Sequence, residues 1–334
     1  MTTPAQRMDS PVADNGYAWW YIDGVSDDGH TAVTAIVFVG SVFSPWYFDA
    51  RRSGPTDPLQ HAAINVSIRS HGRHFWVMNE GARPASARSA AQFSVTPTST
   101  LAWQNGQLVL DFDEVTRPFF QRMPARIAGR LTLTPQLRHD ATVALDAAGR
   151  HHWCAVAPLS RFEIRMEQVQ LQVQGDAYHD CNWGVEPLES AFAGWHWSRA
   201  ALPATGQRSA GTAVLYDTTG RDGTSRLLGR FFADDGTWHA VTDLRSAPLS
   251  TTGWRIARAT RSDDGHAQVR STLEDTPFYA RSLVDGTWLG SRATAVHESL
   301  NLQRFSSPWV RFLLPWRSRR GPPALATGRT EVLA

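Results

Sequence analysis

Asx-Gly dipeptides between short segments of alternating polarity constrain the fold of this chain more than any other feature. Glycine adopts positive φ angles easily, and Asn or Asp before it tolerates them, so the pair favours a tight hairpin turn. A chain with many such turns is expected to fold as antiparallel strands rather than β–α–β units. We expect hairpin turns at Asp28-Gly29, Asn105-Gly106, Asp222-Gly223, Asp235-Gly236, Asp264-Gly265 and Asp285-Gly286.

The segments between turns are typical of strands, because their side chains alternate in polarity with a period of two. Helices are expected only at Pro187–Phe192 and in the C-terminal tail. The predicted fold class is therefore all-β, with a sandwich or an up-and-down barrel as the architecture. Representative strand predictions are Thr31–Val39, Ile64–Ser70, Gln107–Phe112, Ala128–Thr134 and Phe162–Val173.

A weak internal repeat divides the chain into two parts. Tyr21-Ile22-Asp23, before the turn at Asp28-Gly29, is similar to Tyr216-Asp217, before the turn at Asp222-Gly223. A chain of 334 residues is long enough to build a core in each part. We predict two β-barrel-like domains in tandem, residues 1–185 and residues 186–334, the second ending in a basic amphipathic tail.

Composition excludes several classes of function. The 33 basic and 31 acidic residues give a net charge of +2, which argues against a nucleic-acid partner. Every basic residue is arginine, so Schiff-base and P-loop chemistry are excluded. Cys154 and Cys181 form no CxxC or zinc-finger pattern, and we expect a reducing cytoplasm. We expect neither a signal peptide nor a membrane-spanning segment.

The segment Tyr178–Gly184 carries an unusual concentration of chemistry for what we expect to be a turn-like connection. His179, Asp180 and Cys181 are potential metal ligands, but adjacent residues of a strand point to opposite faces, so we predict no metal site. His151 and His152 are also adjacent, so they would point to opposite faces and could not bind one metal ion together. Neither a GxSxG elbow nor a GxGxxG loop is present, so a serine hydrolase and a nucleotide cofactor are also not supported.

Two aromatic segments could line a ligand tunnel. In Gly16–Asp23, Trp19 and Tyr21 would share one strand face and Trp20 the other. This segment is either ordinary barrel core or the aromatic wall of an apolar tunnel. In Val39–Tyr47, small and large residues alternate, which fits either a strand that bends to open a lumen or a plain strand end.

Carboxylates provide the candidate acids. Asp217 follows the apolar or small residues Thr212–Leu215, and apolar surroundings would raise its pKa and suit a general acid. The alternative is a turn residue that caps the hairpin. Glu298 follows His297 as a second candidate, whereas Asp275 and Arg281 are expected to form a structural ion pair.

The tail Phe305–Arg320 interleaves arginines with Trp309, Phe312 and Trp316. This pattern suits the surface of an anionic membrane. Packing of a last helix onto a barrel is the alternative.

The chain resembles the carotenoid 1,2-hydratase family, also called hydroxyneurosporene synthases. The resemblance spans about Gly16 to Pro315 and implies two tandem lipocalin-like β-barrel domains with a short C-terminal helix. It implies addition of water to the terminal double bond of acyclic carotenoids such as neurosporene or lycopene, without an organic cofactor. The segments that carry it are Gly16–Asp23, Gly40–Tyr47, Glu186–Ala200, Leu215–Asp217, Leu273–Leu283 and His297–Leu300.

This reaction requires a protonated acid, aromatic faces for a tertiary carbocation, and one admitted water. On the resemblance, Asp217 is the expected acid, and Tyr216 either orients it or lines the site. Trp183, with Trp195 or Trp197, is expected to face the cation. His179, with Asp180 or Asn182, is expected to position the water. The remaining expected substrate-binding residues are Tyr178, Trp19, Tyr21 and His297.

The chain departs from the pattern that we expect of relatives at two positions. His196 stands where we expect an acid, and Cys181 where we expect His or another polar residue. Two other functions stay open: a non-catalytic carrier of a long apolar ligand, and an isomerase or cyclase acting on another polyene. The expected location is cytoplasmic, at a membrane surface, and the sequence predicts no oligomeric state.

Overall fold

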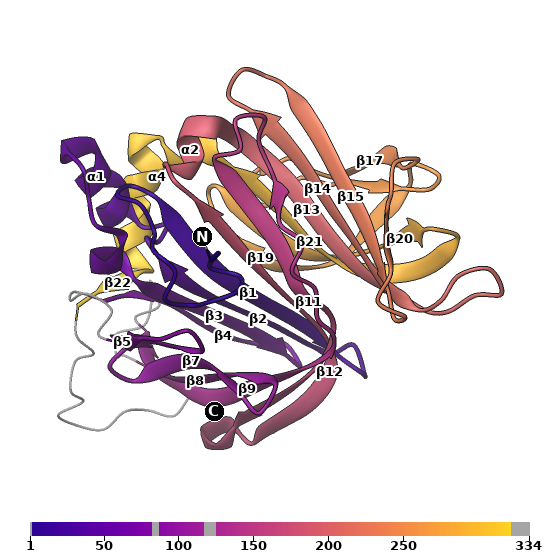
Figure 1. Cartoon of the computed structure of the whole chain (residues 1–334), viewed down its shortest axis with the longest axis horizontal. Helices are drawn as coiled ribbons and strands as arrows, with labels where there is room; N and C mark the ends of the chain where they lie inside the picture. The colour runs from indigo at the N-terminus through magenta and orange to yellow at the C-terminus, as the bar shows by residue number, and fades with distance from the viewer. Residues whose placement is uncertain (1, 82–86, 117–124, 322–334) are drawn as a thin grey trace. The chain divides into compact units, whose positions relative to one another are not determined.

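The computed structural model describes residues 2–81, 87–116 and 125–321, and these ranges are mostly β-strand (Figure 1). The chain divides into two compact units. Unit 1 comprises Met1–Pro187 with Arg311–Ala334, and unit 2 comprises Leu188–Val310. The all-β prediction is confirmed.

Unit 1 is built on one large sheet. Its neighbours run in the order β22-β4-β3-β2-β1-β12-β11-β9-β8-β7-β6-β5, with β10 beside β11. The strands are β1 (Tyr17–Ser26), β2 (Thr31–Val39), β3 (Ala63–Ser70), β4 (Arg73–Glu80), β5 (Ala87–Arg88), β6 (Gln92–Thr96), β7 (Ser99–Gln104), β8 (Gln107–Thr116), β9 (Ala125–Leu137), β10 (Val143–Ala144), β11 (His151–Met166), β12 (Leu171–Gly184) and β22 (Arg319–Arg320).

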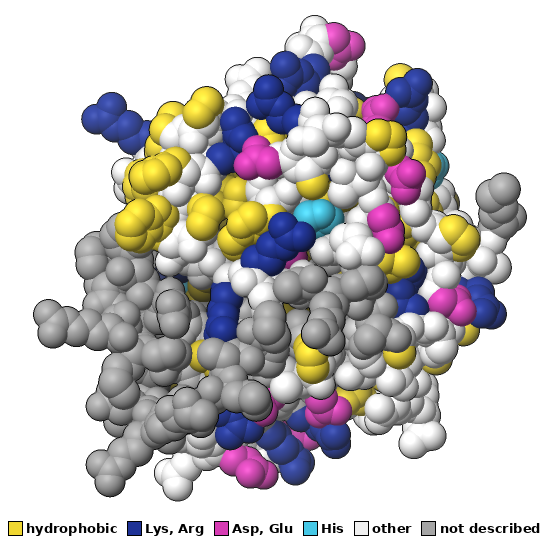
Figure 2. Space-filling model, turned by 90° about the vertical axis from the view of Figure 1, so that its left-hand side faces the viewer, with side chains coloured by type: hydrophobic (Ala, Val, Ile, Leu, Met, Phe, Trp, Pro, Cys, Tyr) yellow, Lys and Arg dark blue, Asp and Glu magenta, His cyan; other side chains and the backbone are white. Residues whose placement is uncertain are grey.

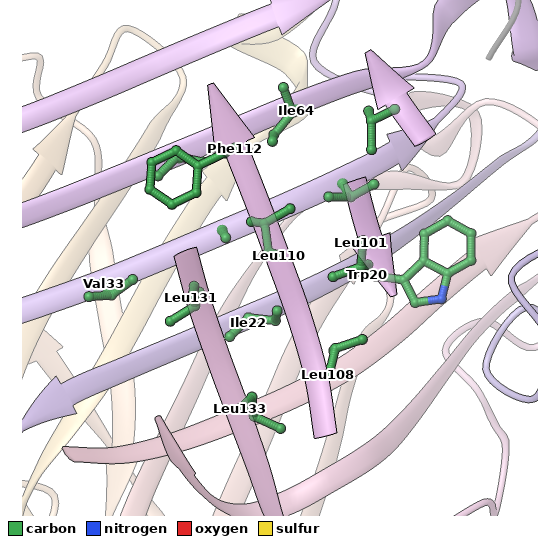
Figure 3. Packing of buried hydrophobic residues seen from close by; sticks show 14 of the residues in the cluster. Trp20, Ile22, Val33, Ile64, Leu101, Leu108, Leu110, Phe112, Leu131 and Leu133 are labelled. Carbon is green, nitrogen blue, oxygen red and sulfur yellow. The ribbon is translucent and has the colours of Figure 1, made fainter. Parts of the chain in front are cut away.

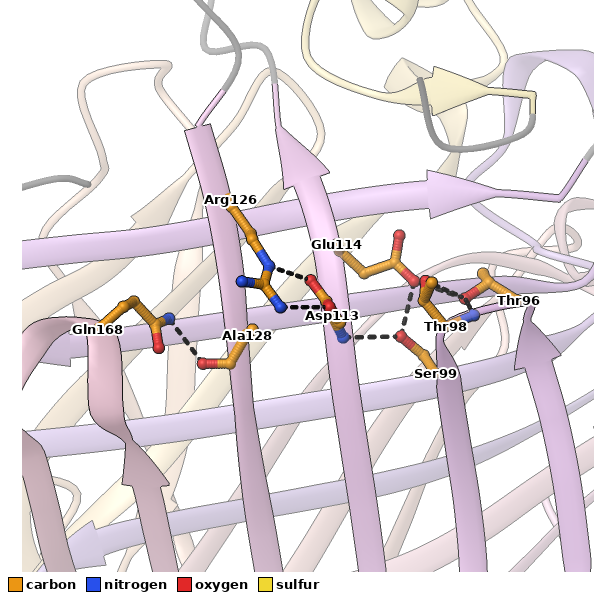
Figure 4. A network of polar contacts seen from close by, with 8 residues as sticks. All are labelled: Thr96, Thr98, Ser99, Asp113, Glu114, Arg126, Ala128 and Gln168. Carbon is orange, nitrogen blue, oxygen red and sulfur yellow. Dashed lines mark hydrogen bonds and ion pairs between the residues drawn. The ribbon is translucent and has the colours of Figure 1, made fainter. Parts of the chain in front are cut away.

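The sheet of unit 1 curls over on itself. Asn79 on β4 donates a hydrogen bond of 2.6 Å to Glu114 on β8, although six strands separate β4 from β8 in the order above. The Glu114 carboxylate also accepts hydrogen bonds from Thr96 Oγ1 at 2.6 Å and Ser99 Oγ at 2.7 Å (Figure 4). The bond from Asn79 to Glu114 joins β4 to β8 across the curled sheet, and the bonds from Thr96 and Ser99 hold the Glu114 carboxylate in place.

The space inside the curl is filled by apolar side chains. Alternate residues of each strand point to the same face, so Trp20 and Ile22 on β1 meet Leu108 and Leu110 on β8 (Figure 3). All four side chains are at most 2% exposed. The inner face of the unit 1 sheet is therefore a packed core.

Unit 2 has a smaller sheet with the order β16-β15-β14-β13-β21-β20-β19, and a separate ribbon of β17 and β18. Phe231, Val284 and Trp288 are among the buried residues of its own core. The strands are β13 (Phe192–Leu202), β14 (Gly211–Gly220), β15 (Ser225–Ala233), β16 (Trp238–Ala240), β17 (Arg245–Leu249), β18 (Arg258–Ser262), β19 (Ala267–Asp275), β20 (Tyr279–Trp288) and β21 (Ser291–Asn301).

The helices are short. They are α1 (Pro45–Ser53), η1 (Pro58–His61), η2 (Glu167–Val169), α2 (Leu188–Ala191), α3 (Leu302–Phe305), α4 (Pro308–Leu313) and η3 (Leu314–Trp316). Within the described ranges, no helix combines the length and the apolar character needed to cross a membrane.

Most of the predicted turns are correct. Gly29, Gly106, Gly223, Gly236 and Gly265 all have positive φ angles between 72° and 89°. The first four connect paired strands, whereas Gly265 lies between β18 and β19, which do not pair with each other in the described sheets.

The turn predicted at Asp285-Gly286 is wrong, because both residues lie inside β20. A side chain on Gly286 would come within 2.8 Å of the buried Trp288 ring, so glycine makes room for that ring. The chain turns instead at Leu289 and Gly290, whose φ angles are 51° and 76°.

Three other expectations are corrected. Val39–Tyr47 is not a bent strand: Ser44 caps the N-terminus of α1 by accepting from Tyr47 N at 3.1 Å, and Pro45 begins the helix. Phe162–Val173 contains a turn, since β11 ends at Met166 and Gln170 has a φ of 51°. Tyr178–Gly184 is no connection but the second half of β12.

The C-terminal segment from Arg311 lies along one edge of unit 1. Arg311 donates to Asp49 of α1 at 2.6 Å, and Arg317 stacks over Trp76 of β4 at 4.3 Å. Beyond them, β22 pairs in parallel with β4, with Arg320 opposite Glu80.

Candidate functional site

The outer face of β12, β1 and β11 in unit 1 collects buried polar and aromatic side chains. Pairing places Tyr21 opposite Asp180, and Trp153 opposite Asn182. Residues paired across antiparallel strands lie on the same face. We call this set the polar-aromatic face; each member is at most 6% exposed. It consists of Tyr17, Trp19, Tyr21, Asp23, His151, Trp153, Tyr178, Asp180 and Asn182.

Asp180 lies at the centre of the polar-aromatic face. Its Oδ2 accepts hydrogen bonds of 2.9 Å from the Tyr178 hydroxyl and 2.9 Å from Trp153 Nε1. The Trp153 N–H also lies 3.2 Å from the Tyr178 hydroxyl, so the three side chains form a closed triangle. Both donors are neutral, and Asp180 is 2% exposed. Burial of this kind favours the proton-carrying form of a carboxyl group.

His151 and Tyr17 form a second polar pair on the same face. The Tyr17 hydroxyl lies 2.8 Å from His151 Nδ1, and Glu186 Oε1 lies 3.5 Å from His151 Nε2. Burial lowers the pKa of His151, although Asp146 and Glu186 act in the opposite direction.

Aromatic rings surround these polar groups. Tyr17 and Trp19 stack with ring centroids 4.9 Å apart, and Trp19 lies 6.3 Å from Phe38 of β2. Tyr21 meets Tyr178 edge-on at 6.4 Å. The electron-rich faces of such rings stabilise a nearby cation.

His179 and Trp183, which we expected at the site, lie on the opposite face of β12. They alternate with Tyr178, Asp180 and Asn182 along the strand. His179 Nδ1 lies 2.8 Å from the Tyr21 carbonyl oxygen, and burial lowers the pKa of His179 to about 4. The half-buried Trp183 stacks on His152, with centroids 5.4 Å apart. Neither side chain joins the polar-aromatic face.

In unit 2, Trp195, Trp197 and Tyr216 share one face of β13 and β14. Trp195 meets Tyr216 edge-on at 6.0 Å. Glu298 lies opposite Trp197 on the same face and accepts from Arg281 Nε at 3.0 Å.

The ion pair expected between Asp275 and Arg281 is wrong. β19 and β20 place Glu274, not Asp275, opposite Arg281, and the Arg281–Glu274 distance is 3.6 Å. Asp275 instead accepts a hydrogen bond of 3.2 Å from the Trp254 backbone N–H. Nearby, burial raises the pKa of Tyr279 well above its ordinary value.

Asp217 and His297 point to the other face of the unit 2 sheet. Asp217 Oδ2 accepts a hydrogen bond of 2.8 Å from Arg261 Nε, and both side chains are about a quarter exposed, at 24% and 27%. The apolar surroundings expected for this carboxylate are therefore not found, because Asp217 is partly exposed and paired with a guanidinium.

His297 belongs to a buried hydroxyl network. Ser198 Oγ lies 2.9 Å from His297 Nδ1, and Ser299 Oγ lies 2.9 Å from His297 Nε2. Ser299 Oγ also lies 2.9 Å from Nδ1 of His196, the residue opposite Asp217. Burial lowers the pKa of His297 to about 3.

Four members of the polar-aromatic face were missed as site residues: Tyr17, Asp23, His151 and Trp153. The sequence singled out His151 only as a metal ligand, and Tyr17 and Asp23 only as parts of an aromatic segment and a repeat, whereas Trp153 carried no local signal. Trp153 reaches Asp180 only through the register of β11 on β12. Among the described residues, no group of three or more His, Cys, Asp or Glu could hold a metal ion.

Comparison with known proteins gives consistent matches. Residues 35–324 match the family model described as "Carotenoid hydratase CrtC". A Thiocapsa roseopersicina protein named "Acyclic carotenoid 1,2-hydratase" is 43% identical over 316 residues, 94% of this chain and 75% of the relative. A Rubrivivax gelatinosus protein of the same name is 40% identical over 321 residues, 95% of this chain and 76% of the relative.

A solved structure shares the fold. It is that of a candidate AttH from Nitrosomonas europaea, with a TM-score of 0.56 and 14% sequence identity. The match covers 90% of this chain and 98% of the other. At this identity the likeness concerns the fold alone.

Proposed function

Because the chain belongs to the carotenoid hydratase CrtC family, we propose that it adds water to the terminal 1,2 double bond of acyclic carotenoids such as neurosporene and lycopene. The enzyme is then a hydro-lyase that makes a tertiary 1-hydroxy product. The observation that carries the mechanism is the buried carboxyl group of Asp180, held by Tyr178 and Trp153.

Asp180 is the proposed proton donor. Tyr178 and Trp153 both donate to Oδ2, and in this proposal Oδ1 is the oxygen that carries the acidic proton. Transfer of this proton to C2 of the alkene leaves a tertiary carbocation at C1. Asp217 is the alternative donor, but its side chain is 24% exposed and accepts a hydrogen bond from the Arg261 guanidinium, so it lacks the apolar surroundings of Asp180.

The aromatic rings of the polar-aromatic face are proposed to stabilise the carbocation. Trp153, Tyr178 and Tyr21 surround Asp180, and each suitably placed ring contributes about 0.5–2 kcal/mol. Water is excluded from a face whose members are at most 6% exposed, which protects the cation from uncontrolled capture. Burial lowers the pKa of His151, which disfavours a competing positive charge on the imidazole.

The remaining predicted residues are assigned to substrate binding. Trp19, with Asn182 on the neighbouring strand, extends the polar-aromatic face beyond Asp180. Trp195, Trp197 and Tyr216 give unit 2 an aromatic face suited to an apolar polyene. His179, Trp183 and His297 are assigned supporting roles behind these faces, since each points into the opposite side of its sheet.

A single incubation tests the proposed function. Purified protein is mixed with lycopene in detergent, in water labelled with oxygen-18, and products are analysed by mass spectrometry. A hydratase yields a 1-hydroxy carotenoid that carries the label. A carrier binds lycopene without changing it, and an isomerase changes it without taking up label; either result would refute the proposal.

We also propose that the protein works at the cytoplasmic surface of a membrane, where its apolar substrate resides. Trp309, Phe312 and Trp316 follow one another along α4 and η3 and are 45%, 68% and 53% exposed. Arg304 and Arg317 flank them, and Figure 2 shows hydrophobic and arginine side chains next to one another on the surface. This combination suits an interface with anionic lipids.

A further inference from the structure

The polar-aromatic face contains a tyrosine and an aspartate two residues apart on each of two strands. Tyr21-Ile22-Asp23 lies on β1, and Tyr178-His179-Asp180 lies on β12. The two strands are antiparallel, and their register sets Tyr21 opposite Asp180 and Asp23 opposite Tyr178. Each tyrosine therefore faces the aspartate of the other triplet.

The two triplets make the same internal contact. The Tyr21 hydroxyl donates to Asp23 Oδ2 at 3.0 Å, as the Tyr178 hydroxyl donates to Asp180 Oδ2 at 2.9 Å. The two tyrosine rings touch edge-on at 6.4 Å. Asp23 is 1% exposed and Asp180 is 2% exposed. Two buried carboxyl groups thus share one face with two hydroxyl groups between them.

The spacing of these carboxyl groups suits chemistry on a small molecule between them. Asp23 and Asp180 are diagonal neighbours across the strand pair, a relation that places side chains about 7–8 Å apart. Enzymes that hold a water molecule between a carboxylic acid and a carboxylate space them at about 6.5–9.5 Å. The diagonal spacing of Asp23 and Asp180 is therefore of the same order as that of such an acid and base.

The environments of the two carboxyl groups differ. Asp180 accepts from both Tyr178 and Trp153, which fixes the carboxyl plane for proton donation. Asp23 lies opposite Thr34 of β2, a buried hydroxyl residue, and accepts from Tyr21. The hydration as proposed assigns a donor for the first proton but no acceptor for the proton that the attacking water must lose.

We propose that Asp23 is a second catalytic carboxyl group, which holds the attacking water and accepts its proton. This inference rests on the proposed hydratase function. The carboxylic acid of Asp180 gives its proton to C2, a C–H bond forms, and the π bond becomes a cation at C1. The water oxygen bonds to C1, and the Asp23 carboxylate takes one of its protons.

The step balances without a co-reactant. One water is added across the double bond, Asp180 is left ionised, and Asp23 is left protonated. Transfer of that proton from Asp23 back to Asp180, by way of water or the tyrosine hydroxyls of the same face, restores the starting state. The reverse sequence dehydrates the alcohol, with Asp23 as the acid.

Deuterium exchange separates the two carboxyl groups. In heavy water, Asp23→Asn keeps the donor, so the cation forms, loses a proton from C2 and returns to lycopene that carries deuterium. We expect hydration by this variant to fall by at least about 100-fold while deuterium enters C2 of the recovered substrate. Asp180→Asn is expected to lose both hydration and exchange. Both readouts come from mass spectrometry and NMR of the same extract.

Two further variants complete the experiment. Tyr21→Phe removes the donor to Asp23 but keeps the ring, so hydration should fall while exchange persists, even if Asp23→Asn does not fold. Asp176→Asn, on the exposed start of β12 and paired with Arg161, should behave as the parent enzyme. Hydration at the parent rate by Asp23→Asn or Tyr21→Phe, or loss of exchange together with hydration, would overturn the role of Asp23. A parent enzyme that makes no labelled alcohol would overturn the hydratase function itself.

Discussion

The Arg261 guanidinium lies against the carboxylate of Asp217, with Nε donating to Oδ2 at 2.8 Å. Because this pair is about a quarter exposed and lies on the face of its sheet opposite to Trp197 and Tyr216, we expect Asp217→Asn to retain hydration of lycopene within a few-fold of the parent rate. The cost in unfolding free energy should be at most about 1 kcal/mol, as for other exposed pairs. Arg261→Gln is the matched control and should show the same small change. A loss of activity in Asp217→Asn as large as in Asp180→Asn would return the donor role to Asp217.

The hydrogen bond from the Trp153 N–H to Asp180 should increase the rate of proton donation without being essential for it. Trp153→Phe keeps an aromatic ring beside the cation but removes a hydrogen bond to Asp180 Oδ2. We expect kcat to fall by roughly 10- to 100-fold, since Asp180 becomes ionised as it gives up its proton and a hydrogen bond to a charged group contributes about 1.5–3 kcal/mol. Trp153→Leu, which also removes the ring, should fall further. Equal rates in both variants would contradict a role for the ring, and the measurement is the initial rate of alcohol formation.

Acid should unfold the protein through its buried histidines. Burial lowers the pKa of His179 to about 4 and that of His297 to about 3, from an ordinary 6.5. The unfolded chain therefore binds these protons first, so stability is fully present above pH 6.5 and falls as the pH drops below it. Each histidine contributes a loss of about 1.4 kcal/mol per pH unit until its folded pKa is reached.

Denaturant titrations between pH 7 and pH 4 check this expectation. His179→Gln should flatten the pH dependence of unfolding for unit 1, and His297→Gln for unit 2. His266→Gln, at an exposed position, is the control and should leave the slope unchanged. A parent protein that is equally stable at pH 7 and pH 4 would contradict the burial of these imidazoles.

The exposed aromatic residues of α4 and η3 should mediate binding to membranes. We expect Trp309→Ala together with Phe312→Ala to reduce co-sedimentation with anionic lipid vesicles by about 10-fold or more, since two large apolar side chains no longer enter the interface. Trp238→Ala is a close control, because Trp238 is 45% exposed, as is Trp309. If the Trp238 variant loses as much binding as the α4 variant, exposure of tryptophan alone explains the effect.

Local sequence signals predicted the strands and most of the turns, because both depend on residues close together in the chain. Thr31–Val39 coincides with β2, and Asn105-Gly106 connects β7 to β8. The helix α1 also has a local signal, a serine followed by proline at Ser44-Pro45, whereas the alternation in Val39–Tyr47 suggested either a bent strand or a plain strand end. The family resemblance predicted the function more specifically than any single motif did.

Which residues come together at the site is decided by side-chain direction and strand register, and local sequence signals do not reveal the register. Alternation along β12 separates His179 from Asp180, and alternation along β14 separates Tyr216 from Asp217. That alternation was sufficient to reject a metal site at His179, Asp180 and Cys181, and the same reasoning would have divided the expected catalytic residues. Register is a long-range property: Trp153 meets Asp180 only because β11 pairs with β12.

The pairing of β1 with β12 also governs when the polar-aromatic face can form. β1 ends at Ser26 and β12 ends at Gly184, so these neighbours in the sheet are far apart in the chain. Bringing such distant segments together is slow, because the entropy of closing a long loop must be overcome before their contacts form. During synthesis on the ribosome, Tyr21 and Asp23 must therefore wait for nearly all of unit 1 to emerge before Asp180 reaches them. The face that carries the proposed chemistry is completed late, after the hairpin of β1 and β2 has had time to fold.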